Sequence, residues 1–112
     1  MIQTFLVSGA AGALGMALTQ ILLGRGHRVI ATDIDQEAID AEAKRLCLDK
    51  HRLLTRALDV TQAERWEALL DEVCADGPLD VLIQCAGVID GAPLVTQGPE
   101  AARAHLEVNA LG

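Results

Sequence analysis

A glycine-rich segment near the N-terminus has the residue types and spacing that suit the binding of a phosphate group. It runs from Ser8 to Gly15 as Ser-Gly-Ala-Ala-Gly-Ala-Leu-Gly, so that Gly9, Gly12 and Gly15 are three residues apart. In a strand-to-helix turn the first glycine permits a sharp bend, the second lets a pyrophosphate approach the backbone, and the third lets the helix pack closely on the strand. The N–H groups and the dipole of that helix would face the phosphates. The segment therefore predicts a dinucleotide site; the alternative is an ordinary glycine turn.

An acidic residue, Asp33, ends the next apolar run, 18 residues after Gly15. A carboxylate in this position accepts hydrogen bonds from the adenosine ribose hydroxyls and repels a 2′-phosphate. Neither Ala10 and Ala11 in the glycine loop nor Ile34 after the run offers a positive charge to such a phosphate. The sequence therefore favours NAD over NADP, and the alternative for Asp33 is a polar strand end. Asp35 is better placed to cap the following helix than to bind a ligand.

Short apolar runs alternate with amphipathic segments along the chain and supply the elements that would hold these residues. Strands are expected at 2–8, 27–33, 53–58 and 79–85, and helices at 13–23, from residue 36, after the possible capping box Thr61-Gln-Ala-Glu64, and at 99–111. This rhythm is typical of right-handed βαβ units and a parallel sheet with helices on both faces. The run 79–85 is almost continuously apolar, as expected for a strand that is covered on both faces.

The first three expected helices also have an apolar face. Gly24 and Gly26 would end the first of these helices. The apolar residues at helical spacing are Leu14, Leu18, Ile21 and Leu22 in the first helix, Ile39, Ala43, Leu46 and Cys47 in the second, and Trp66, Leu69, Leu70 and Val73 in the third.

Composition and charge exclude several classes of protein. Sixteen acidic residues stand against nine lysines and arginines, without a basic cluster, so a nucleic-acid partner is not expected. The apolar runs are too short to cross a membrane, and the first residues lack the basic region of a signal peptide, which makes the cytoplasm the expected location. No metal site is expected from the scattered cysteines and histidines: Cys47, Cys74 and Cys85 are predicted to be buried small hydrophobes, and His27, His51 and His105 to lie at the surface or at element boundaries.

From Ser8 onward the motifs resemble those of the short-chain dehydrogenase/reductase family. The glycine motif of that family is Thr-Gly-x-x-x-Gly-x-Gly; Gly9 and Gly15 match it, whereas Ala13 replaces the middle glycine. Gly12 falls where the related sugar-nucleotide epimerases and dehydratases place theirs. Asp59-Val60 is similar to the Asp-Val pair of the family, which implies contacts to the adenine amino group and ring nitrogen. The alternative for this pair is a strand end leading into the next helix.

Two later motifs continue the resemblance. Gln84-Cys85-Ala86-Gly87 is similar to Asn-Asn-Ala-Gly, and the matching Ala86-Gly87 would pass close to the cofactor ribose. Val108-Asn109 lies 22 residues beyond Gly87 and is similar to the Val-Asn of the family, which implies that Asn109 holds a water in the proton relay to the catalytic lysine. The alternative for Asn109 is a cap at a helix C-terminus.

The resemblance implies an α/β fold of the Rossmann type, a doubly wound parallel sheet with strand order 3-2-1-4. Residues 1–112 would be its NAD(P)-binding domain without the C-terminal half, and the dinucleotide would lie over the first and fourth strands. The implied site consists of catalytic Asn109 and the cofactor-binding residues Ser8, Gly9, Ala11, Gly12, Ala13, Leu14, Gly15, Asp33, Ile34, Asp59, Val60, Cys85, Ala86 and Gly87.

The implied function is NAD-dependent hydride transfer on a small alcohol or carbonyl substrate. The chain contains no tyrosine and lacks the catalytic Ser and Tyr-x-x-x-Lys of the family, so these 112 residues are not expected to turn over alone. The alternatives are a sugar-nucleotide epimerase or dehydratase and a non-catalytic NAD-binding module. A homo-oligomer is expected if the edge of the fourth strand has no further strand beside it.

Overall fold

The computed structural model describes residues 1–86, which form a four-stranded parallel sheet flanked by helices. The strand order is β3-β2-β1-β4, which confirms the predicted order 3-2-1-4. In chain order the elements are β1 (Thr4–Ser8), α1 (Ala13–Gly24), β2 (Arg28–Asp33), α2 (Gln36–Arg45), β3 (Leu53–Ala57), α3 (Ala63–Cys74) and β4 (Val81–Gln84). Each strand is slightly shorter than its predicted range.

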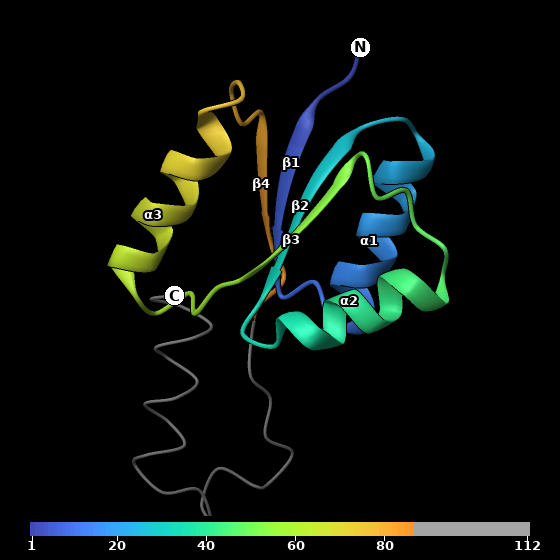
Figure 1. Cartoon of the computed structure of the whole chain (residues 1–112), viewed down its shortest axis with the longest axis horizontal. Coiled ribbons are helices and arrows are strands. Elements are labelled where there is room, and N and C mark those ends of the chain that lie inside the picture. The colour runs from blue at the N-terminus through green and yellow to red at the C-terminus, as the bar shows by residue number, and fades with distance from the viewer. Residues whose placement is uncertain (87–112) are drawn as a thin grey trace, which may run out of the picture.

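Helices cover both faces of this sheet, with α1 and α2 on one face and α3 on the other (Figure 1). Because successive side chains of a strand point to opposite faces, the two central strands supply both cores. Val7 of β1 packs on the side of α1 and α2, whereas the adjacent Leu6 packs on the side of α3; both are fully buried. This explains why β1 and β2 are continuously apolar rather than alternating.

The face of α1 that packs on the sheet agrees only in part with the one that the leucine spacing predicts. Its buried residues are Gly15, Met16, Thr19 and Leu23, whereas Leu14 is 66% and Ile21 is 52% exposed. A Cβ on Gly15 would collide with the Gly9 carbonyl and the Ala10 backbone, so α1 lies too close to the loop for a large side chain at that point. Of the predicted apolar stripe, Leu14 and Ile21 therefore face outward, whereas Leu18 and Leu22 are half-buried and Leu22 packs against the core.

Two of the predicted helix ends are confirmed. The Asp35 carboxylate accepts the Ala38 N–H at 3.1 Å and caps α2, and α1 ends at Gly24, two residues before Gly26, whose φ is +88°. The predicted capping box is wrong, because the N-cap of α3 is Gln62 and has no side-chain cap bond. The Thr61 hydroxyl does not accept a helix N–H; it donates to the Asp59 carboxylate, a charge-assisted hydrogen bond.

The prediction that the cysteines are buried is wrong for two of the three. Cys47 and Cys74 are exposed, and Cys85 is half-buried. Cys47 follows the end of α2 in a backbone conformation of positive φ, and Cys74 is the last residue of α3, past the buried Val73. The fourth strand also differs from expectation, because Leu82 is 46% exposed within the part of the chain that the structure describes. There, β4 is not fully covered on its α3 side.

Two of the histidines lie where the sequence predicts. His27 stands just before β2, where its Nδ1 accepts the Gln3 N–H at 3.0 Å and its ring meets Phe5 edge-on. His51 is exposed in the connection between α2 and β3. His105 lies outside the described residues.

Candidate functional site

The carboxyl ends of the strands bring the predicted site residues to one edge of the sheet. Register pairs Ser8 with both Thr32 and Gln84, and Asp33 with Ala57. The ends of β1, β2 and β4 are therefore level, and the turn after β3 begins beside them. Open α/β sheets bind ligands at this edge, in the crevice where the strand order reverses.

Two glycines of the loop are required by the protein's own packing. Gly9 has a φ of +68°, a conformation that other residues rarely adopt, and a Cβ there would lie 2.5 Å from the Ala86 nitrogen. Gly15 lies against the Gly9 carbonyl, as described above. The loop therefore passes directly over the end of β4 while α1 packs closely against the loop.

Gly12 differs from these two glycines. It is the N-cap of α1, it is exposed, and a Cβ built on it would meet only the Gly9 oxygen, at 3.4 Å. No side chain caps α1, and its first turn contains no acidic residue. Among the described residues no side chain caps the first turn of α1, where the backbone can be approached closely, although the Asp33 carboxylate lies at the Ala11 N–H just before the N-cap.

Asp33 fastens this loop to the end of β2. Its Oδ2 accepts the Ala11 N–H at 3.1 Å and its Oδ1 accepts the Asp35 N–H at 3.1 Å. Beside this contact, the Ala10 N–H donates to the Thr32 carbonyl at 2.9 Å. The sequence points to the Asp33 carboxylate but not to its backbone partners, because every residue except proline carries the same N–H.

Two buried hydroxyls lie beneath the loop. Thr32 Oγ1 donates to the Val7 carbonyl at 3.0 Å and so ties β2 to β1. Ser8 Oγ is buried and meets no hydrogen-bond partner within residues 1–86, although the Ser8 carbonyl accepts the Cys85 N–H at 3.0 Å. Sequence reasoning missed Thr32; the available signal was a polar residue inside the apolar run 27–33.

Asp59 and Val60 form the turn that leads into α3. Asp59 Oδ1 accepts the Thr61 hydroxyl at 2.6 Å and the Thr61 N–H at 3.0 Å, and these bonds hold the pKa of Asp59 below its usual value. The Val60 carbonyl accepts the indole N–H of Trp66 at 3.0 Å. In this structure the pair therefore has the alternative role considered from the sequence, a strand end leading into a helix, while its contact with adenine stays a prediction.

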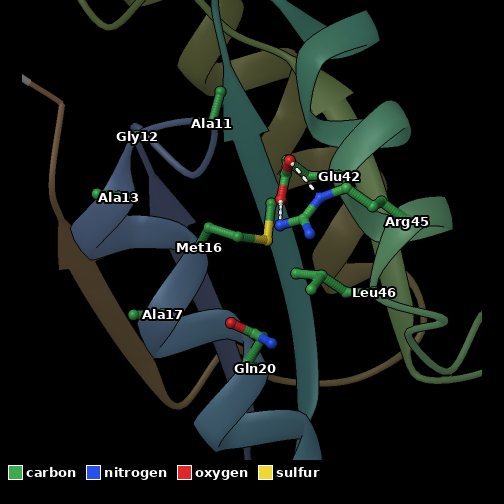
Figure 2. Close-up of a pocket in the computed structure, with 9 residues that line it drawn as sticks. All are labelled: Ala11, Gly12, Ala13, Met16, Ala17, Gln20, Glu42, Arg45 and Leu46. Atoms are coloured by element: carbon green, nitrogen blue, oxygen red, sulfur yellow. Dashed lines mark hydrogen bonds and ion pairs between the residues drawn. The ribbon is translucent and has the colours of Figure 1, made fainter.

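A groove of about 320 Å³ lies between α1 and α2, next to the loop (Figure 2). Ala11, Gly12 and Met16 line one side, and Glu42 and Arg45 of α2 line the other. Arg45 donates to both Glu42 oxygens, at 2.9 and 2.8 Å. This pairing lowers the pKa of Glu42 and raises the pKa of Arg45. Sequence analysis did not single out either residue.

The remaining predicted residues divide into two groups. Ala13 and Leu14 are exposed in the first turn of α1, and Ile34 is exposed after β2, all at the same edge of the sheet. Gly87 and Asn109 lie outside the described residues. Within residues 1–86 there is no group of three or more His, Cys, Asp or Glu residues that could hold a metal ion. In that same range no helix has the length and apolarity needed to cross a membrane.

Comparison with known proteins shows the family to which this chain belongs. A family model described as short chain dehydrogenase matches residues 3–112. The chain belongs to the short-chain dehydrogenase family. Its sheet order and flanking helices are those of the Rossmann-type fold that the sequence predicted.

Two known oxidoreductases match the chain along most of its length. An uncharacterized oxidoreductase of Mycobacterium bovis is 36% identical over 99 residues, which are 88% of this chain and 40% of that protein. The cis-4-hydroxycyclohexanecarboxylate dehydrogenase of Sinomonas cyclohexanicum is 36% identical over 108 residues, 95% of this chain and 43% of that protein. The chain thus spans less than half the length of these two relatives.

A solved structure agrees with this membership. The short-chain dehydrogenase/reductase from Brucella melitensis described as a glucose/ribitol dehydrogenase superposes with a TM-score of 0.88 at 25% identity, covering 96% of this chain and 46% of that one.

Proposed function

We propose that this chain is the nucleotide-binding part of an NAD-dependent oxidoreductase acting on a small alcohol or carbonyl compound. The observation that carries the proposal is the 3.1 Å hydrogen bond between the Asp33 carboxylate and the Ala11 N–H, because it holds a negative charge beside the glycine-rich loop. An adenosine ribose next to that loop would present hydroxyl donors to the carboxylate. A 2′-phosphate in the same place would be repelled, which supports NAD over NADP.

The residues at the start of α1 fit the pyrophosphate of such a cofactor. The N-cap Gly12 leaves its backbone open on the outer side, and the helix behind it is uncapped by side chains and without acidic residues in its first turn. Phosphate groups would accept hydrogen bonds from the N–H groups of Ala13 and Leu14 and would lie at the positive end of the dipole. This arrangement would orient the dinucleotide along the edge where β1 and β4 end.

The reaction divides between cofactor and chain. The nicotinamide supplies the hydride chemistry when it is bound, and the residues of this chain bind and orient the cofactor. Because the chain contains no tyrosine, it lacks the Tyr-x-x-x-Lys of the family. We therefore expect the 112 residues alone to bind NAD without turnover. The catalytic role of Asn109, the cytoplasmic location, the homo-oligomer and the single domain over residues 1–112 stay predictions.

A calorimetric titration of the chain with NADH tests the proposal. We expect NADH to bind and the Asp33→Ala variant to bind it about tenfold more weakly, since a charge-assisted hydrogen bond contributes about 1.5–3 kcal/mol. Asp76→Ala is the matched control, because it removes an exposed carboxylate from the connection between α3 and β4. Absence of binding, or binding indifferent to Asp33→Ala, would contradict the proposal.

A second candidate is a sugar-nucleotide epimerase or dehydratase of the same superfamily. One observation favours it: a glycine at position 12, rather than 13, forms the N-cap of α1. Both candidates share the dinucleotide, so they differ in the substrate that the complete protein requires. Activity that depends on a nucleotide sugar would support the second candidate, and oxidation of a simple alcohol would support the first.

A further inference from the structure

The groove between α1 and α2 adjoins the proposed ribose position. Ala11 belongs to both places, because its N–H donates to Asp33 at 3.1 Å and the residue also lines the groove together with Gly12. Across the groove stand Glu42 and Arg45 on α2, whose side chains reach back toward Met16 of α1 (Figure 2). The Asp33 carboxylate and the groove therefore share Ala11 as a neighbour, so charges on the groove walls would act on a phosphate attached to a ribose beside Asp33.

The net charge on the α2 side of the groove depends on a single ion pair, between Glu42 and Arg45. Both Glu42 oxygens accept hydrogen bonds from Arg45, one from Nε and one from Nη2, in the side-on geometry that carboxylates and guanidinium groups prefer. The Arg45 side chain is 67% exposed, so solvent reaches it, but its two best-directed donors are occupied by Glu42. The pair therefore contributes no net charge to the groove.

We propose that the Glu42–Arg45 pair is a second determinant of cofactor choice, in which Glu42 neutralises the guanidinium that would otherwise attract an adenosine 2′-phosphate. A phosphate is recognised by arginine through paired hydrogen bonds, the same donors that Glu42 now occupies. Asp33 repels the 2′-phosphate from the loop side, and Glu42 cancels the attraction from the α2 side. The inference rests on the proposed function, because it concerns the same dinucleotide.

Titrations of the full chain with NADPH and NADH test the pair. The Glu42→Gln variant keeps the size of the side chain but leaves Arg45 without its ionised partner. We expect the ratio of the two dissociation constants to shift about fivefold toward NADPH, the size of a solvent-exposed charge interaction. Adding Arg45→Met should remove this gain, and raising the salt concentration should reduce it.

Glu67→Gln is the matched control, since it removes the same charge from an exposed position on α3, on the opposite face of the sheet from the groove. An equal shift in Glu67→Gln would show a general charge effect and overturn the proposal. The proposal is also overturned if Glu42→Gln leaves the ratio unchanged, or if the shift persists in the double variant. Failure of the unaltered chain to bind either nucleotide is a distinct result, because it contradicts the proposed function and with it the inference that rests on it.

Discussion

The Asp33 carboxylate accepts the backbone N–H of Ala11 at 3.1 Å, so the last residue of β2 holds the middle of the loop that follows β1. Asp33, which is proposed to favour NAD over NADP, therefore also positions the loop that would bind the cofactor. A change at Asp33 is expected to alter the stability of the chain even without nucleotide.

Replacing Asp33 by alanine should lower the free energy of unfolding by about 1–3 kcal/mol, because the N–H groups of Ala11 and Asp35 lose their acceptor. Asp33→Asn should cost less, since its single amide oxygen still accepts one of these bonds. Urea unfolding curves of the three proteins measure the difference. Equal stability of all three would show that the contact does not hold the loop.

Replacing Gly15 and replacing Gly12 should have different effects: the first should lower stability, and the second should weaken NADH binding. Gly15→Ala should lower the free energy of unfolding by about 1–3 kcal/mol, because its Cβ would overlap the Gly9 carbonyl and the Ala10 backbone. Gly12→Ser should leave stability within about 0.5 kcal/mol, since serine is a good N-cap and the position is open. NADH binding to Gly12→Ser should nevertheless weaken about tenfold or more, because its Cβ would stand where the pyrophosphate approaches.

Thermal unfolding with and without NADH distinguishes these two effects. A Gly12→Ser variant that still binds NADH normally would show that the pyrophosphate does not lie at this N-cap. A Gly15→Ala variant as stable as the unaltered chain would contradict the close packing of α1 against the loop.

Truncation of two leucines in α1 tests which of its faces packs on the sheet. Leu23→Ala should destabilise the chain by about 2–5 kcal/mol, because Leu23 is buried in the core that α1 shares with β1 and β2. Leu14→Ala should change stability by no more than about 0.5 kcal/mol, since most of that side chain is exposed. The two variants remove the same atoms from one helix, so each is the control for the other in denaturant titrations.

The turn after β3 should respond to acid in a way that depends on Thr61. Hydrogen bonds from the Thr61 hydroxyl and N–H lower the pKa of Asp59, so the ionised carboxylate stabilises the folded chain. This contribution is present above the pKa of an unfolded aspartate, about 3.9, and is lost as the pH falls through the lower folded value. In Thr61→Val the pKa of Asp59 should rise toward its ordinary value, whereas Thr61→Ser should preserve the lowered pKa. A carboxyl NMR titration measures both, and an unchanged pKa in Thr61→Val would exclude the hydroxyl as the cause.

The secondary structure and part of the candidate site could be predicted from the sequence alone. The apolar runs and the glycines between them predicted all the strands and helices that residues 1–86 contain. The strands were visible because burial on both faces of a parallel sheet leaves a continuous apolar run in the sequence. The loop from Ser8 to Gly15 and the acid at the end of β2 were also visible, since each depends on residue type and on spacing within one βαβ unit.

Contacts between elements could not be predicted from the spacing of residues in the sequence and were decided by the tertiary structure. The leucine stripe of α1 indicates an amphipathic helix but does not fix which side faces the sheet; because α1 approaches the loop closely at Gly15, the side that carries Gly15 and Met16 is buried. Thr61 matches a capping box in the sequence, yet in the fold Gln62 is the N-cap and the Thr61 hydroxyl donates to the Asp59 carboxylate. Arg45 is 12 residues beyond Asp33 in the chain, and only the packing of α2 beside α1 brings it to the groove that Ala11 also lines. Periodicity records burial along one element, whereas contacts between elements depend on distances that the tertiary fold sets.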